Sequence, residues 1–109
     1  MLSKAVVRAA DCLDIPNVLL GKILGCSLTT VARLYSGDYR LEHRRKEWEL
    51  ALLFVRVFLS LDSFVGNQKT ARQWLVSHNL ALGSRPIDLL ATAEGMDRVV
   101  HYLDASRDH

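Results

Sequence analysis

The chain has 109 residues and a mass of 12.3 kDa, which allows one compact domain or two small units that share a core and excludes a multidomain enzyme. Half of its residues are hydrophobic and 24% are charged, so it can bury a core and is not a disordered tail. The formal net charge is +2, and Lys and Arg outnumber Asp and Glu most clearly within residues 22–46, which is a modest footprint for an anionic partner.

The first third of the chain predicts three short helices. Apolar residues recur with the helical period over residues 2–13, and Ser3 is the expected cap of this helix. A break that contains a proline follows, and the second helix is expected to end at Gly25. Ser27 is a natural N-cap for the third helix, and Gly37 supplies its left-handed stop.

The second and third helices have the spacing of a helix-turn-helix. This motif needs a small residue where the helices touch, a glycine in the turn and a buried residue in the second helix, and Gly21, Gly25 and Val31 meet these needs. On DNA, Arg33 could bond guanine in a bidentate manner, while the surrounding basic side chains would contact phosphates. A helical hairpin that serves only packing is the alternative. The residues expected to face DNA are Lys22, Ser27, Leu28, Thr29, Thr30, Arg33, Arg40, Arg44 and Arg45.

Residues 45–66 are apolar on nearly every side and predict one long helix. Its polar positions, which are Arg45, Glu49, Arg56, Ser60 and Ser63, form a narrow stripe, so we expect burial on more than one face. The most apolar stretch, residues 50–61, is broken by Arg56 and falls short of the ~20 residues that a membrane span needs, which favours a soluble protein. The helix is expected to pack on its own chain and on a second copy, although a core helix within a monomer is the alternative. The expected dimer contacts are Trp48, Leu52, Val55, Phe58 and Leu59.

The remaining residues predict three further elements. A helix carries Ala71, Trp74, Leu75 and His78 on one face and leads into a loop over residues 79–84. Pro86 opens a short helix, and a last helix places apolar residues at helical spacing over 96–103 before a polar tail over 104–109. No segment alternates with period two, so the chain is predicted to be all-α.

The sequence carries no pattern that is typical of catalysis or of metal binding. Cys12 and Cys26 form no CxxC motif and are expected to be free thiols in a reducing compartment. The four histidines, which are His43, His78, His101 and His109, fit no zinc-ligand spacing. Nucleophile elbows and phosphate-binding loops are missing as well. We therefore expect no enzymatic activity, no metal and no cofactor.

The second half of the chain carries a series of residues at fixed spacings, which are Trp74, Leu75, Asn79, Leu82, Gly83, Pro86, Ile87, Asp88, Leu89, Leu90, Thr92, Glu94 and Gly95. In this series the chain resembles the toxin-binding domain of the Xre/MbcA/ParS antitoxins, the bacterial partners of RES-domain toxins. The helix-turn-helix in front extends the resemblance over essentially the whole chain.

The resemblance implies a cytoplasmic bacterial type II antitoxin that dimerises, binds its cognate RES-domain toxin and blocks the active site of that toxin. RES toxins resemble ADP-ribosyl-transferring enzymes and act on NAD, so the chemistry belongs to the partner. Such antitoxins also commonly bind their own promoter and repress the operon. The alternative is a stand-alone helix-turn-helix regulator without a toxin partner.

The resemblance also implies a division of the chain. Residues 1–44 are expected to form the helix-turn-helix, 45–66 the dimerising helix and 67–109 the toxin-binding domain. Gly83 permits a backbone conformation that a side chain would strain, and Pro86 fixes the entry of the next helix, so the loop is expected to be a rigid binding surface. The expected toxin contacts are Asn79, Leu82, Gly83, Arg85, Pro86, Ile87 and Asp88, with Arg98, His101 and Arg107 from the last helix and the tail facing an acidic catalytic groove.

Overall fold

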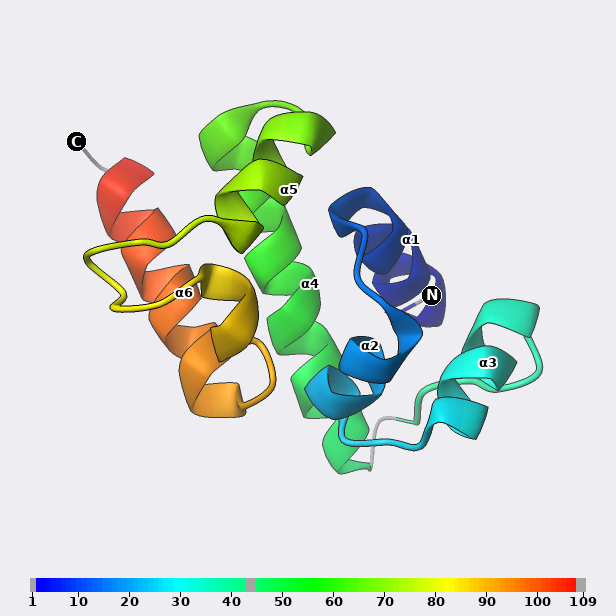
Figure 1. Ribbon diagram of the computed structural model, residues 1–109. Helices are drawn as coiled ribbons and strands as arrows, with labels where there is room; N and C mark the ends of the chain where they lie inside the picture. Colours follow the sequence, from blue (N-terminus) through cyan, green and yellow to red (C-terminus); the bar gives the residue numbers. More distant parts are fainter. Residues whose placement is uncertain (1, 43–44, 108–109) are drawn as a thin grey trace.

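The computed structural model describes residues 2–42 and 45–107, and within these residues the chain forms helices and no strand. The prediction of an all-α fold, with an N-terminal helix-turn-helix joined by a long helix to a small helical unit, is confirmed. In chain order the elements are α1 (Leu2–Leu13), α2 (Asn17–Leu24), α3 (Leu28–Ser36), α4 (Lys46–Val65), α5 (Gln68–Val76), the short 3-10 helix η1 (Pro86–Leu89) and α6 (Ala93–Arg107) (Figure 1).

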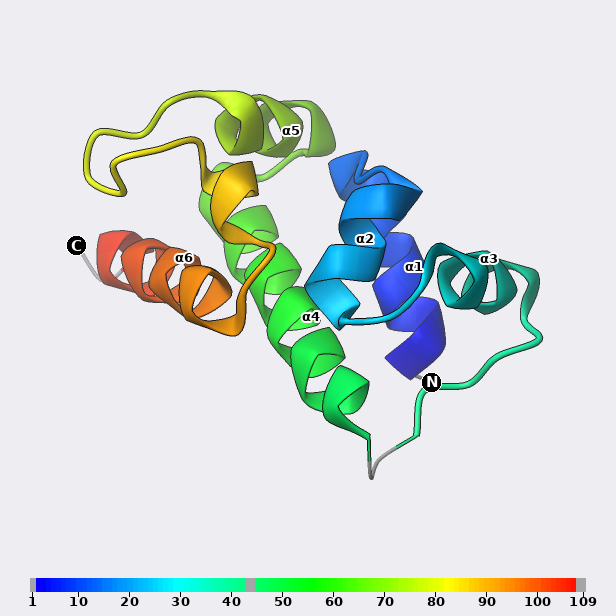
Figure 2. The ribbon, with the colours of Figure 1, turned by 60° about the horizontal axis from the view of Figure 1, so that its bottom comes forward.

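Helix α4 is the central helix of the molecule. It packs against α1 and α2 on one side and α6 on the other, while α5 lies at its C-terminal end and contacts both α4 and α1 (Figures 1 and 2). Phe54, Val57 and Leu61 on α4 are completely buried and belong to a single hydrophobic cluster that takes in side chains from both sides. The two halves of the chain therefore share one core, and neither half has a closed core without α4.

The helix ends of the N-terminal half follow the capping residues. Gly25 and Gly37 close α2 and α3 with φ values of 71° and 85°, a left-handed region that glycine enters without steric cost. The Ser27 side chain accepts a hydrogen bond from the amide of Thr30 and so caps α3 as predicted. The prediction for Ser3 is wrong, because α1 already begins at Leu2 and the Ser3 hydroxyl instead accepts a hydrogen bond from the Leu41 amide at 3.1 Å.

Two further predictions need correction, and both concern the contact between α4 and α6. Ser60 does not lie on an exposed polar stripe: it is buried, and its hydroxyl donates to an Asp104 carboxylate oxygen at 3.2 Å. Arg56 approaches the other Asp104 oxygen at 3.6 Å. The expected polar tail is helical as far as Arg107, because Asp104 is held against α4 by these partners.

Among the residues that the structure describes, no single helix is both long and apolar enough to cross a membrane, and only the bent pair of α2 and α3 reaches that length and composition.

Candidate DNA-binding and toxin-binding surfaces

The helix-turn-helix has the geometry that the sequence predicted. The chain turns by 103° between α2 and α3, within the range that the motif requires. Gly21 lies at the contact: the amide of Cys26 donates to its carbonyl oxygen at 2.9 Å, and a Cβ at this position would lie only 3.0 Å from the Cys26 carbonyl oxygen. Val31 is fully buried beneath the turn. Close approach of the two backbones therefore fixes the angle at which α3 is presented.

The outer face of α3 offers fewer available side chains to a partner than the sequence suggested. Leu28, Thr29 and Arg33 are exposed and open to a partner. Ser27 and Thr30, by contrast, have their hydroxyl groups 3.0 Å apart in a mutual hydrogen bond at the N-terminus of the helix. Because these groups satisfy each other, they have less capacity to bond base edges or phosphates.

Arg33 is held close to its own helix. One of its terminal nitrogens donates to the Asp38 carbonyl oxygen at 3.5 Å, and its guanidinium lies 5.9 Å from the centre of the Tyr39 ring. The Tyr39 hydroxyl in turn donates to Glu47, and this hydrogen bond raises the pKa of Tyr39. Arg33 would give up these two contacts on bonding a guanine.

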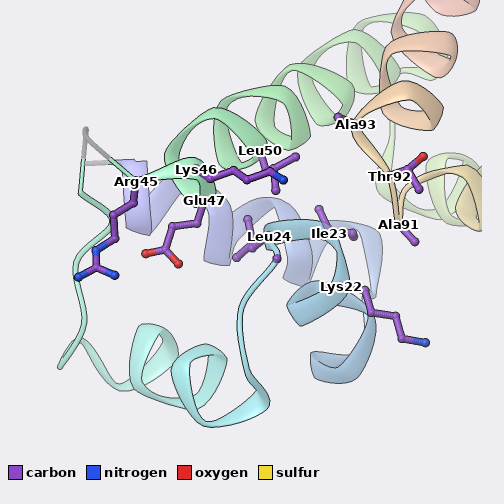
Figure 3. Close-up of a pocket in the computed structure, with 11 residues that line it drawn as sticks. Lys22, Ile23, Leu24, Arg45, Lys46, Glu47, Leu50, Ala91, Thr92 and Ala93 are labelled. Carbon is purple, nitrogen blue, oxygen red and sulfur yellow. The ribbon is translucent and has the colours of Figure 1, made fainter.

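The basic residues around α3 do not form one continuous patch. Lys22 and Arg45 lie on opposite sides of a surface cavity and point away from each other (Figure 3). Arg45 is paired with Glu42 at 3.3 Å, and that carboxylate raises the pKa of the guanidinium. Arg40 is exposed, whereas Arg44, also predicted to contact DNA, lies outside the described residues. Phosphate contacts from this side would therefore be few and separated.

The cavity between Lys22 and Arg45 has a volume of about 580 Å³ and is formed by the end of α2, the start of α4 and the turn before α6. A second hollow of about 310 Å³ continues it along α4 and shares Leu50 and Ala93 with it. The floor of the larger cavity is apolar, and the charged side chains around that cavity do not converge on one point (Figure 3). In the described part of the chain, no three His, Cys, Asp or Glu side chains are grouped as metal ligands.

The loop between α5 and η1 is held in one shape by its own hydrogen bonds. The Asn79 amide donates to the Ser84 carbonyl at 3.0 Å, and the Gly83 amide donates to the Asn79 carbonyl at 2.9 Å. The Asn79 side chain accepts from the Leu82 amide at 3.1 Å. Gly83 has a φ of 76°, which a residue with a side chain rarely adopts. The segment over residues 79–84 is therefore an ordered turn, as the sequence predicted.

Several of the predicted toxin contacts have structural roles. Leu82 is only 7% exposed and Pro86 is buried, so both side chains belong to the core and not to an open surface, which corrects their assignment as contacts. Ile87 is half-buried against the same core. Arg98 donates from α6 to the Leu82 carbonyl at 2.9 Å and fastens the loop to the last helix.

Other predicted toxin contacts remain at the surface. Arg85 and Asp88 are each about half exposed and form a two-pronged ion pair, with distances of 3.0 and 2.9 Å. The hydrogen bond from Arg85 lowers the pKa of Asp88. His101 is exposed and lies 3.8 Å from Asp97. Arg107 is the last residue of α6, and its side chain lies outside the described part of the structure.

The side chains expected to form a dimer contact are divided between the inside and the outside of the molecule. Trp48, Val55 and Phe58 are half-buried and pack against the core of the chain itself. Leu52 and Leu59 are 45% and 58% exposed and lie on the outer side of α4. Of the five expected dimer contacts, these two are therefore the ones most exposed to a second copy.

Two residues that matter in this region were not singled out from the sequence as site residues. Leu80, in the turn between α5 and η1, is 91% exposed. Thr92 accepts a hydrogen bond from the Gly95 amide at 3.0 Å and caps α6. The spacing of Thr92 and Gly95 was visible in the sequence, but a single leucine in a loop gives no periodic signal.

Comparison with known proteins finds two family models that match this chain. Residues 1–56 match the model of the antitoxin Xre-like helix-turn-helix domain, and residues 60–108 match that of the antitoxin Xre/MbcA/ParS C-terminal toxin-binding domain. A chain in the crystal structure of the M. tuberculosis MbcT-MbcA toxin-antitoxin complex is similar, with a TM-score of 0.71 and 25% identity over 96% of this chain and 92% of that chain. No curated protein matches this chain.

Proposed function

Because this chain belongs to the Xre/MbcA/ParS antitoxins, with the Xre-like helix-turn-helix and the toxin-binding domain of that family, we propose that it neutralises a cognate RES-domain toxin by covering the active site of that toxin. The toxin would consume NAD or transfer ADP-ribose, and this chain would hold no catalytic group of its own. The matched complex pairs a toxin with an antitoxin, which supports a protein partner of this kind.

The observation that carries the proposal is the ordered surface between α5 and α6. Its loop is fixed by three internal hydrogen bonds and by Arg98, and it presents Gly83, Arg85 and Asp88 to solvent. A surface that is already ordered loses little conformational entropy when it binds. The toxin would therefore meet a preformed shape.

The proposal is tested by exchanging the charges of the exposed ion pair. In the double variant Arg85→Asp with Asp88→Arg, an acidic and a basic side chain still face each other, so the loop keeps its internal pair while the charges that a partner meets are reversed. The readout is growth of cells that express the toxin together with this chain from unrelated promoters. We expect the wild-type chain to rescue growth and the double variant to fail.

A matched control is available in the other half of the molecule. Glu42 and Arg45 form a second exposed pair with the same spacing, and exchanging their charges should leave rescue intact. Circular dichroism should show the same helix content for all variants. Full rescue by the variant at positions 85 and 88 would remove this pair from the toxin contact.

The helix-turn-helix supports a second role, which is repression of the operon that encodes the chain. Leu28, Thr29 and Arg33 would enter the major groove, and Lys22, Arg40 and Arg45 would contact phosphates. Because few contacts to bases are available, affinity should depend mainly on phosphates and fall steeply with salt. If Arg33→Ala left operator affinity unchanged across a salt series, α3 would not be the recognition helix.

We further propose that the chain acts in the bacterial cytoplasm as a homodimer, with residues 1–44, 45–66 and 67–109 serving DNA binding, dimerisation and toxin binding. The exposed Leu52 and Leu59 on α4 support the dimer, because two apolar side chains on one helix face gain free energy when a second copy covers them. Should no toxin be found, a stand-alone regulator with the same helix-turn-helix would be the alternative.

A further inference from the structure

We infer that Leu80 is the apolar anchor of the toxin-binding surface, a side chain that enters an apolar pocket on the toxin. This inference rests on the proposed function and names the residue that would supply the largest apolar contact with the toxin. It also assigns a chemical character to the partner site, which would be a pocket sized for a leucine and lined by apolar groups.

The first support is the exposure of Leu80 relative to other apolar residues of the toxin-binding domain. At 91% exposed, it is the most open large hydrophobic residue in the described structure, while Phe64 and Val76 are 39% and 51% exposed. The other large apolar side chains of this domain are mostly buried, including Leu75, Leu82, Leu90, Met96 and Leu103. Burial of apolar area at the centre of an interface supplies much of the affinity of protein complexes. Leu80 has the largest exposed fraction of these apolar side chains and so has the most area left to bury against a partner.

The second support is the rigidity of the segment that carries it. Leu80 and Ala81 form the tip of the turn that is closed by the bonds from the Leu82 amide to the Asn79 side chain and from the Gly83 amide to the Asn79 carbonyl. The segment projects from the body of the molecule in both views (Figures 1 and 2). A flexible loop could fold an exposed leucine back onto the protein, but this turn holds it out, so the side chain is positioned before the partner arrives.

The third support is that the polar side chains near Leu80 already have partners within the chain. Arg85 and Asp88 are paired with each other, and the exposed Arg98 donates one hydrogen bond to the Leu82 carbonyl while keeping its charge. A partner that approaches this surface therefore meets one protruding leucine beside charged side chains that can orient it. This arrangement, an apolar centre surrounded by satisfied polar groups, is typical of the energetic centre of an interface.

The test compares the affinity of the full chain and its variants for the purified toxin that is encoded in the same operon, measured by calorimetry. Leu80→Ala should raise Kd by about 10- to 100-fold, the range that follows from burial of one leucine side chain, and Leu80→Asp should weaken binding further. Val18 is 60% exposed on α2, so Val18→Asp is a matched loss of an exposed apolar residue away from this surface and should leave Kd unchanged. Because Leu80 makes no core contact, its variants should unfold at the wild-type temperature.

The outcomes separate this inference from the proposed function. Tight binding by the wild-type chain and equal binding, within about twofold, by both Leu80 variants would overturn the role of Leu80 and leave the antitoxin assignment intact. A wild-type chain that fails to bind the toxin would overturn both. Loss of affinity in the Leu80 variants, with Val18→Asp unchanged, is the result that supports the anchor.

Discussion

At the scale of single residues, close backbone contacts decide what the C-terminal half can tolerate. Gly95 is buried at the start of α6, where a Cβ would lie 1.9 Å from the Leu89 carbonyl oxygen. No side chain fits at such a distance, so η1 can lie against α6 only because this residue is glycine. Pro86 at the start of η1 and Leu90 directly after it are buried as well. Because the ordered loop leads into η1, its position depends on this packing of η1 against α6.

Replacing Gly95 with alanine should therefore cost at least about 3 kcal/mol of unfolding free energy, the upper range for overpacking a filled site. Denaturant unfolding monitored by Trp fluorescence measures this loss. Gly37→Ala is the comparison, because a Cβ there meets nothing within 4 Å and only the left-handed backbone, at about 1 kcal/mol, opposes it. Equal losses for the two variants would show that η1 moves aside without cost.

The ion pair of Arg85 and Asp88 gives the loop a defined response to acid. The hydrogen bond from Arg85 holds the pKa of Asp88 below its ordinary value of 3.8. A carboxyl group whose pKa is lowered by folding contributes stability above its ordinary pKa, and this contribution is lost as the pH falls through the lowered value. Binding to the toxin should therefore not change through Asp88 between pH 5 and pH 8.

Titration of the Asp88 carboxyl carbon by NMR checks this relation. In the variant Arg85→Gln the pKa of Asp88 should rise toward 3.8, because the charged hydrogen-bond donor is gone. An unchanged pKa in that variant would mean that the ion pair does not persist in solution.

At the scale of helices, features set by neighbouring residues were predicted from the sequence, whereas features set by distant contacts were not. The capping positions at Gly25, Ser27 and Gly37 were predicted correctly, because a cap depends on a few neighbouring residues. The roles of Ser60, Leu82 and Arg98 were not predicted, because each is set by a partner that is 16 or more residues away or by burial in the shared core. Sequence periodicity reports which face of a helix is apolar and not which polar residue finds a buried partner.

One such long-range contact fixes α3 to α1. The Tyr35 hydroxyl donates to an Asp11 carboxylate oxygen at 3.3 Å, and burial, followed by the charge of Asp11 and this hydrogen bond, raises the pKa of Tyr35 to about 12. A phenol with a raised pKa contributes stability that is complete below its ordinary value of 10.0 and is lost as the pH rises through about 12. The contact between α3 and α1 should thus persist throughout the physiological pH range.

Absorbance at the phenolate band tests this contact. The titration of Tyr35, identified as the signal that Tyr35→Phe removes, should have its midpoint near 12 in the wild-type chain. In Asp11→Asn the midpoint should fall but stay above 10.0, because burial is the largest cause and remains. A Tyr35 midpoint at the ordinary value in the wild-type chain would contradict the anchoring of α3 to α1.

The outer face of α4 carries the prediction for assembly. If Leu52 and Leu59, which are 45% and 58% exposed, meet a second copy, the double variant Leu52→Glu with Leu59→Glu should lose roughly 1 kcal/mol or more of dimerisation free energy for each leucine and become monomeric. Light scattering at micromolar concentration measures the mass directly. A wild-type chain that is monomeric under the same conditions would count against this interface.

At the scale of the whole molecule, the two functional halves are joined through more than the chain itself. Beside the shared core on α4, Arg72 of α5 donates to the Cys12 carbonyl at 3.0 Å, and Gln68 donates to the Cys12 sulfur at 3.3 Å. These bonds tie the end of α1 to the C-terminal half. We therefore expect one cooperative unfolding transition for the entire chain, with no separate melting of the helix-turn-helix.

If the chain neutralises an NAD-consuming toxin, as proposed, the effect is measured most directly as NAD consumption by the protein that co-purifies with the tagged chain from its native operon. After separation, the partner should consume NAD, and addition of this chain should suppress that activity completely near equimolar ratio. The chain alone should leave NAD intact. Undiminished NAD consumption in the presence of excess chain, or the absence of any stoichiometric partner, would contradict the claim and leave DNA binding as the function to test.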